Sequence, residues 1–66
     1  MGANANVVIY DDPVTRRRPI GRARLISRIR TLGVIDGRDL ELWTVRFHGD
    51  RATCEMCWLA EPAEEI

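Results

Sequence analysis

A chain of 66 residues forms one small domain at most, and at this length folding buries only about 60% of the surface that the unfolded chain exposes. Ten basic residues balance ten acidic residues, so the net charge of zero argues against a strongly basic nucleic-acid binder and against an acidic tail. With 45% hydrophobic and 30% charged residues, the composition is typical of a folded chain rather than a disordered one.

The first apolar segment is short. Residues 7–10 have the sequence Val-Val-Ile-Tyr, which predicts a strand but is too short for a signal peptide or a membrane span. We therefore expect a cytoplasmic protein without membrane contact, in which the cysteines stay reduced. A loop over residues 11–20 follows the strand, and residues 1–6 are expected to form a flexible tail.

Residues 21–32 alternate in polarity, which predicts a strand with arginine on one face. A helix is the alternative, because the apolar residues of this segment also fit one helical stripe. In the strand, the arginine face comprises Arg22, Arg24, Ile26, Arg28 and Arg30, and the opposite face comprises Ala23, Leu25, Ser27, Ile29 and Thr31.

The connection at residues 36–38 sets the pairing of this strand with the next one. A three-residue loop with glycine in its centre keeps the apolar faces together, whereas a strict two-residue turn would put Arg30 beside Trp43. We therefore predict the longer loop or a bulge near Gly33. The predicted pairs are Ile35 with Asp39, Thr31 with Trp43, and Ile29 with Val45.

Residues 40–47 alternate cleanly and predict a second long strand. Gly49-Asp50 then fits a two-residue hairpin turn that has glycine first. The turn pairs His48 with Arg51, Phe47 with Ala52, Val45 with Cys54, and Trp43 with Met56. In this register one face collects the side chains that a one-sided core requires. They are Trp43, Val45, Phe47, Ala52, Cys54, Met56 and Trp58.

Four to five short antiparallel strands with tight turns predict an all-β fold, a small partly open barrel. We expect this single domain to span residues 7–60, with flexible tails at residues 1–6 and 61–66.

Apolar spacing and turns of this chain are shared with a known class of small barrels. The residues concerned are Gly21-x-Ala23-x-Leu25-Ile26, Glu41-x-Trp43-x-Val45-x-Phe47 with Gly49-Asp50, and Trp58-Leu59. In these features the chain resembles an SH3-like barrel of the Tudor or chromo-like kind. It is also similar to short proteins of unassigned function carried by phages and mobile elements, including integron cassettes. The shared features are patterns of spacing, so no functional residue is transferred from the resemblance.

Trp43 and Trp58 are the bulkiest side chains on the predicted core face, and we expect both to fill the core. The alternatives are a stacking platform for bases or a cage for a cation. Tudor-like domains hold methylated ligands in an aromatic cage, for which this chain offers only Tyr10, Trp43, Phe47 and Trp58.

Cys54 and Cys57 form a single C-x-x-C pair. Zinc sites need four ligands, and this pair with the one histidine, His48, falls short of that number within one chain. In a continuous strand the two thiols also point to opposite faces, too far apart for a disulfide between them. We therefore predict no metal and no cofactor, with Cys54 in the core and Cys57 facing outward. The alternative is a zinc site that an acidic residue or water completes, or one to which two chains contribute a cysteine pair each.

Catalytic motifs are not found in the sequence. It contains no glycine-rich phosphate loop, metalloprotease motif or nucleophile elbow, and His48 is expected at a hairpin tip, away from both cysteines. The acidic pairs at 11–12 and 64–65 are expected to be solvated charge. We therefore predict that the protein is not an enzyme and has no catalytic residues.

The neutral net charge conceals a strong asymmetry along the chain. Residues 1–15 carry −2, residues 16–30 carry +7, and residues 31–66 carry −5. Guanidinium groups suit bidentate phosphate contacts and stack on bases, so an arginine loop and strand face would track a nucleic-acid backbone. The candidate nucleic-acid-binding residues are Arg16, Arg17, Arg18, Arg22, Arg24, Arg28 and Arg30.

The same arginines also fit a purely structural role. Charge protects exposed strand edges from pairing with other chains, and acids on neighbouring strands, such as Glu41 and Glu55, neutralise part of the face. The alternative function is a protein-interaction or homo-oligomerisation module. Its interface would use outward apolar residues, namely Ile26, Leu42, Cys57 and Leu59.

Overall fold

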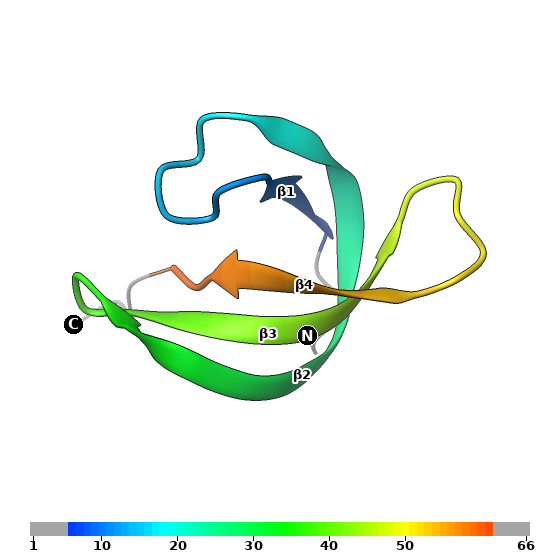
Figure 1. The fold of residues 1–66 in the computed structure, drawn as a ribbon. Helices are drawn as coiled ribbons and strands as arrows, with labels where there is room; N and C mark the ends of the chain where they lie inside the picture. Colours follow the sequence, from blue (N-terminus) through cyan, green and yellow to red (C-terminus); the bar gives the residue numbers. More distant parts are fainter. Residues whose placement is uncertain (1–5, 62–66) are drawn as a thin grey trace, which may run out of the picture.

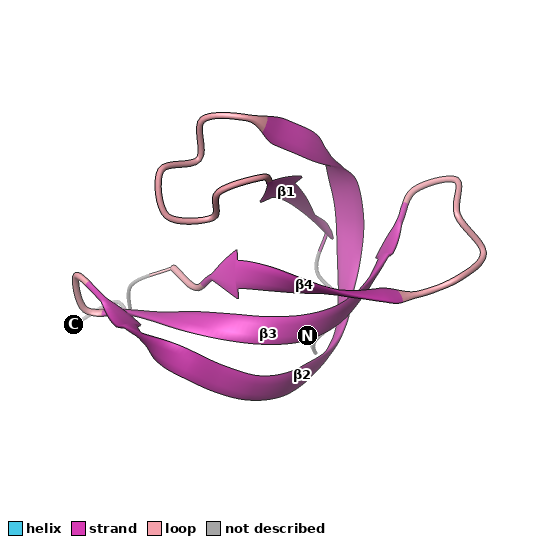
Figure 2. Cartoon of the chain, viewed as in Figure 1, coloured by secondary structure: helices cyan, strands magenta, loops and turns pink. Residues whose placement is uncertain are grey.

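The computed structural model describes residues 6–61, which form four antiparallel strands and, within that range, no helix (Figures 1 and 2). The strands are β1 (Asn6–Tyr10), β2 (Pro19–Ile35), β3 (Arg38–Phe47) and β4 (Cys54–Leu59), and they neighbour one another in sequence order. The sheet curls, so that β1 lies across the concave side from β4 (Figure 1). The prediction of an all-β, partly open barrel is confirmed.

The core lies on the concave face of the curled sheet. Its fully buried members are aliphatic side chains from three strands, and larger side chains pack around them with part of their surface exposed. The buried residues are Ile9, Ala23, Leu25 and Val45, and the partly buried ones are Val7, Trp43, Phe47, Met56 and Trp58. Both tryptophans therefore pack against the core, as expected from the sequence.

The pairing of β3 with β4 confirms part of the predicted register. Val45 pairs with Cys54 and Trp43 with Met56, as predicted. Towards the loop between the two strands, Val45–Cys54 is the last pair of the ladder. The predicted pairs His48–Arg51 and Phe47–Ala52 are wrong, because residues 48–53 form a wider loop instead of a two-residue turn. In that loop the amide of His48 donates to the carbonyl of Arg22 over 3.0 Å, which holds the end of β3 against β2. Ala52 and Cys54 are consequently exposed rather than in the core.

The connection between β2 and β3 is a two-residue turn, not the predicted three-residue loop. Its central residues Asp36 and Gly37 have φ angles of 53° and 75°, the left-handed pair that tight hairpins prefer, and Ile35 pairs with Arg38. Register irregularities between Leu25 and Ser27, between Arg28 and Arg30, and between Thr31 and Gly33 compensate for the shorter turn. The predicted bulge near Gly33 is thus confirmed.

These irregularities also change the register over the rest of β2. Leu25, and not Ile29, lies opposite Val45, and Thr31 lies opposite Glu41 rather than Trp43. Ile29 is 42% exposed, so its predicted place on the core face is wrong. The physical reason is that each extra residue in a strand reverses which face the following side chains occupy.

Arg16 links β1 and β4, which are not hydrogen-bonded to each other within the described sheet. Its guanidinium lies over the rings of Tyr10 and Trp58, at 5.8 Å and 5.5 Å from the ring centroids. The same group donates to the carbonyl of Leu59 over 3.1 Å and pairs with Glu61 at 3.3 Å. We call this arrangement the Arg16 clamp.

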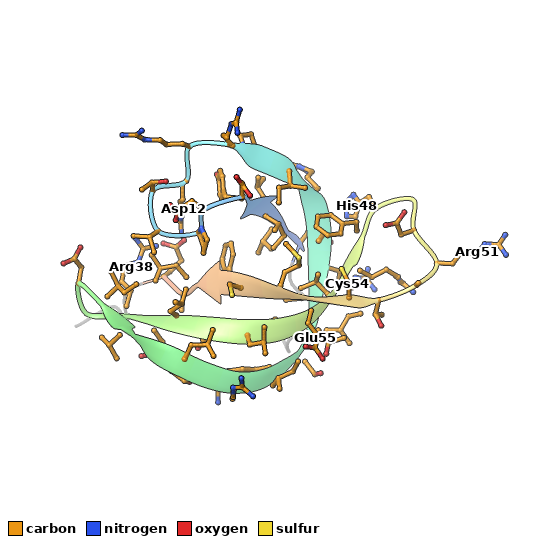
Figure 3. All side chains as sticks on the ribbon, in the orientation of Figure 1. Asp12, Arg38, His48, Arg51, Cys54 and Glu55 are labelled. Carbon is orange, nitrogen blue, oxygen red and sulfur yellow. The ribbon has the colours of Figure 1, made fainter. Side chains whose placement is uncertain are left out.

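The β1–β2 loop holds Arg16 in place through Asp12. The Asp12 carboxylate accepts hydrogen bonds from the amides of Val14 and Thr15, and its carbonyl accepts one from the amide of Arg16. Asp12 is exposed, as expected of solvated charge, and is in addition a turn-forming residue. Figure 3 shows Asp12 and Arg38 at one end of the barrel, with His48, Arg51 and Cys54 at the other.

Two residues that were expected in flexible tails belong to the fold. Asn6 begins β1, and Glu61 pairs with Arg16 and with Arg38. The remainder of the predicted tails, residues 1–5 and 62–66, lies outside the described residues.

The Arg16 clamp should contribute measurably to stability. Arg16→Ala is expected to lower the free energy of unfolding by about 1–2 kcal/mol, because it removes two cation–π contacts and a charged hydrogen bond to a carbonyl. The exposed ion pair with Glu61 adds little. Urea unfolding followed by tryptophan fluorescence measures the loss, with Arg17→Ala, an exposed neighbour, as the control. Equal effects of the two substitutions would contradict the structural role of Arg16.

Candidate nucleic-acid interface

The bulges of β2 distribute its arginines over both faces of the sheet. Side chains directly opposite one another on paired strands share a face. Arg28 lies opposite Trp43, whose side chain packs against the core, so Arg28 belongs to the concave face. Arg24 lies opposite Arg46 and Arg30 opposite Leu42, both on the outer face. The continuous arginine row predicted from Arg22 to Arg30 is therefore wrong.

Arg28 is already partnered by a carboxylate. Its guanidinium pairs with Glu41 at 3.3 Å, and Glu41 is only 6% exposed. The other oxygen of Glu41 accepts a hydrogen bond of 2.7 Å from the indole nitrogen of Trp43. The expectation that Glu41 neutralises part of the arginine charge is confirmed for Arg28. The positive charge of Arg28 compensates the charge of the buried Glu41 carboxylate.

Arg16 is likewise engaged in the fold, so the loop arginines do not act as one group. Arg17 and Arg18 are exposed, whereas Arg16 is held in the clamp. Of the seven predicted nucleic-acid-binding residues, Arg16 and Arg28 are thus structural. The other five are exposed and take part in none of the ion pairs of the described residues, namely Arg17, Arg18, Arg22, Arg24 and Arg30.

One row of polar side chains crosses three strands on the outer face. Asn6 of β1 pairs with Arg24 of β2, which pairs with Arg46 of β3. Two residues from Arg24 along β2, Arg22 lies beside His48, whose amide donates to the Arg22 carbonyl. All five residues are exposed.

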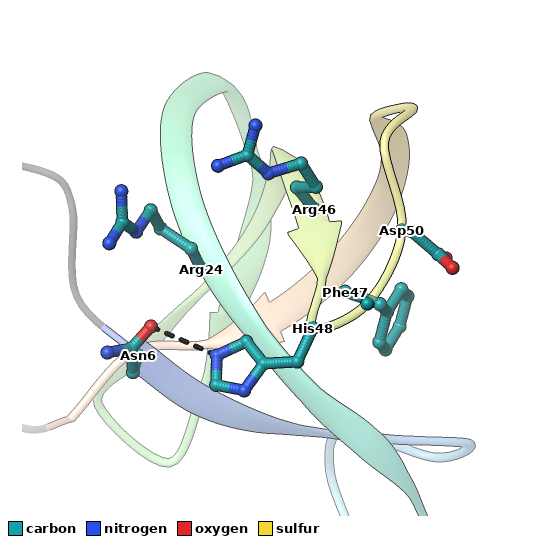
Figure 4. Close-up of a pocket in the computed structure, with 7 residues that line it drawn as sticks. Asn6, Arg24, Arg46, Phe47, His48 and Asp50 are labelled. Atoms are coloured by element: carbon teal, nitrogen blue, oxygen red, sulfur yellow. Dashed lines mark hydrogen bonds between the residues drawn. The ribbon is translucent and has the colours of Figure 1, made fainter.

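The two arginines of this row line a pocket of about 460 Å³, which we call the arginine pocket (Figure 4). Figure 4 shows both guanidinium groups on the same side of the sheet, while the carboxylate of Asp50 points away from them. On the floor of the pocket, Nε2 of His48 lies 3.3 Å from Oδ1 of Asn6, a hydrogen bond in which the amide oxygen accepts. The lining residues are Asn6, Arg24, Arg46, Phe47, His48, Gly49 and Asp50.

The pair Arg24–Arg46 works against the stability of the sheet. Like charges directly opposite on paired strands are destabilising, by a few tenths of a kcal/mol to about 1 kcal/mol. Within residues 6–61, the ion pairs involve Arg16, Arg28 and Arg38, and neither Arg24 nor Arg46 has an acidic partner. A bound anion would remove this repulsion, because each guanidinium offers a planar fork of donors to an oxyanion.

Arg46 and His48 were not among the residues predicted from the sequence. Arg46 alternates with Val45 and Phe47, so its outward direction was visible in the strand pattern. Its position opposite Arg24 was not visible, because that register depends on the irregularity between Leu25 and Ser27.

The predicted apolar interface is corrected in part. Leu59 is 3% exposed and cannot face outward, whereas Ile26, Leu42 and Cys57 are half-buried. The large hydrophobic residues with the most exposed surface are others, mainly in the second half of β2. They are Val14, Ile20, Ile29, Leu32 and Val34.

The cysteines and the other potential metal ligands do not gather at one place. Cys54 is exposed at the start of β4, and Cys57 is half-buried opposite Leu42. Among the described residues, no three His, Cys, Asp or Glu side chains come together as a metal-binding group. Nor does any helix within residues 6–61 have the length and apolar character needed to cross a membrane.

Comparison with known proteins returns no match to any family model, curated protein or solved structure. The resemblance to SH3-like barrels and to short proteins of phages and mobile elements therefore stays a prediction. The arginine pocket is therefore the feature of the molecule from which a function can be inferred.

Reversing the charge of Arg46 should stabilise the fold. Arg46→Glu converts the repulsive pair with Arg24 into a cross-strand ion pair, and we expect the free energy of unfolding to rise by up to about 1 kcal/mol. Thermal unfolding followed by circular dichroism measures the change. Arg51→Glu makes the same change of charge in the 48–53 loop and should leave stability nearly unchanged. A loss of stability in Arg46→Glu would show that the two arginines do not repel each other in the fold.

Proposed function

We propose that this protein is a small cytoplasmic, non-enzymatic module that binds nucleic acid through its phosphates. The observation that carries the proposal is the pair Arg24–Arg46, two exposed guanidinium groups that line one pocket without an acidic partner among the described residues. A phosphate ligand supplies the negative charge that the fold itself does not place there.

Three further exposed arginines extend this site along β2 towards its first residue. Arg22 is two residues from Arg24, and Arg17 and Arg18 directly precede the strand. From Arg18 to Arg24 the extended chain covers about 20 Å. A nucleic-acid backbone presents phosphates at regular intervals over such a length, and contacts to phosphates position a strand without reading its sequence. We therefore propose binding with little sequence preference.

Self-association is the second candidate function, and one observation favours it. Within the described residues, β1 covers only residues 19–24 of β2, so the following half of that strand has a neighbour on the β3 side alone. Ile29, Leu32 and Val34 are exposed on this half. The bulges there discourage edge-to-edge pairing, which is why this candidate ranks second. Sedimentation of the wild type and of Val34→Lys tests it, and a wild-type monomer at high concentration would exclude it.

A salt titration tests nucleic-acid binding. If Arg22, Arg24 and Arg46 each neutralise one negative charge of the strand, the logarithm of the affinity for a single strand should fall with the logarithm of salt concentration with a slope of about −2. Arg46→Gln should weaken binding and make the slope shallower by about 0.7, because one phosphate contact is lost. Fluorescence anisotropy with a labelled oligonucleotide measures both quantities.

Two matched substitutions remove the same charge elsewhere. Arg28→Gln removes an arginine that pairs with Glu41 on the concave face, and Arg51→Gln removes one in the 48–53 loop. Both should leave the salt slope unchanged. No binding of single- or double-stranded DNA or RNA at low salt would exclude the proposal, and equal slopes for the Arg46 and Arg28 variants would move the site away from the arginine pocket.

A further inference from the structure

We infer that the arginine pocket receives the terminal phosphate of a nucleic-acid strand, a phosphate monoester, rather than an internal phosphodiester. The inference rests on the proposed function, because it specifies which phosphate of the nucleic acid enters the same pocket. It follows from the charge of the pocket and from its hydrogen-bond donors.

Charge is the first argument. Arg24 and Arg46 place two positive charges around one pocket, and the ion pairs of the described residues neutralise neither of them. An internal phosphodiester carries one negative charge. A phosphate monoester carries about −1.5 to −2 at neutral pH. Because the two guanidinium groups belong to opposed residues on paired strands, a single −2 group neutralises both at once.

Hydrogen-bonding capacity is the second argument. A monoester presents three terminal oxygens, whereas an internal diester presents two. Two guanidinium forks, each able to bind two oxygens, match the larger number. Asn6 adds to this set, because its Oδ1 accepts from His48 and its amide NH₂ remains available as a donor in the same pocket.

The neighbouring arginine indicates where the strand continues from the pocket. Segment 47–50 lines the pocket at the end of β3, on the side of Arg22, whose carbonyl accepts a hydrogen bond from the amide of His48. Arg22 lies two residues from Arg24, about 7 Å along β2. With an end phosphate between Arg24 and Arg46, a strand that follows β2 past this segment brings its next phosphate near Arg22. The exposed Arg18 and Arg17 lie further along the same direction.

The test compares oligonucleotides that differ only in their ends. Three single strands of identical sequence, each with an internal fluorophore, carry a 5′-phosphate, a 3′-phosphate or two hydroxyl ends, and their affinities are measured by anisotropy. We expect one phosphorylated form to bind about tenfold more tightly than the hydroxyl form, the effect of one additional charge-assisted contact. The form that gains affinity identifies the strand end that the pocket receives.

Substitutions then locate the effect. Arg46→Gln should remove the tenfold preference for the phosphorylated end, whereas Arg51→Gln, with the same change of charge, should retain it. A nucleoside monophosphate should compete with the phosphorylated strand, and the nucleoside should not. A preference that persists in Arg46→Gln would overturn the assignment to this pocket.

The outcomes separate this inference from the proposed function. Equal binding of all three strands, weakened by Arg46→Gln, would overturn the end-phosphate inference and leave nucleic-acid binding intact. Binding of the nucleoside monophosphate alone, lost in Arg46→Gln, would support the monoester pocket and overturn nucleic-acid binding. Absence of binding to the strands and to the monophosphate would overturn both.

Discussion

The fold depends on the unequal lengths of β2 and β3. Between Leu25 and Ile35, eleven residues of β2 lie opposite eight residues of β3, Arg38 to Val45, and three bulges absorb the difference. Bulges increase twist and bend a strand, so they give the sheet the curvature that encloses a core from only four strands. They also decide which face each arginine occupies. The shape of the barrel and the position of its charged groups therefore have one cause.

Arginine has three different roles in this small structure. Arg16 binds the carbonyl of Leu59 and so fastens the end of β4 across the open side of the barrel, and Arg38 at the start of β3 binds the carbonyl of Ala60 beside it. Arg28 pairs with the buried Glu41, which also accepts a hydrogen bond from the indole N–H of Trp43. The arginines on the outer face of β2 and β3 have no such partner among the described residues. The structural arginines differ from those available to a ligand in having a carbonyl or carboxylate partner within the fold.

The predictable part of the fold is the part in which both paired strands alternate without interruption. Residues 43–47 and 54–58 do so, and the pairs Val45–Cys54 and Trp43–Met56 follow from their pattern. For β2 the same reasoning finds the bulge near Gly33 but not the two between Leu25 and Arg30, because those two leave no mark in a sequence of alternating arginine and aliphatic residues. In an uninterrupted strand the Asp36-Gly37 turn would place Arg30 beside Trp43; the bulges place Arg28 there instead, where Glu41 pairs with its charge.

From the sequence, the candidate site was predictable only as a local excess of positive charge. The window of residues 16–30 indicated an excess of arginine, but the pocket is completed by Arg46 and His48 from β3 and the loop that follows it. Whether two outward arginines repel each other or act separately depends on a register shift of one residue. A sheet with five buried hydrophobic residues among those described has little stability in reserve, and a like-charged pair lowers it further. Such a pair is consistent with a fold whose outer face is completed by an anion, since the ligand then supplies the charge that a neighbouring acid would supply in a purely structural sheet.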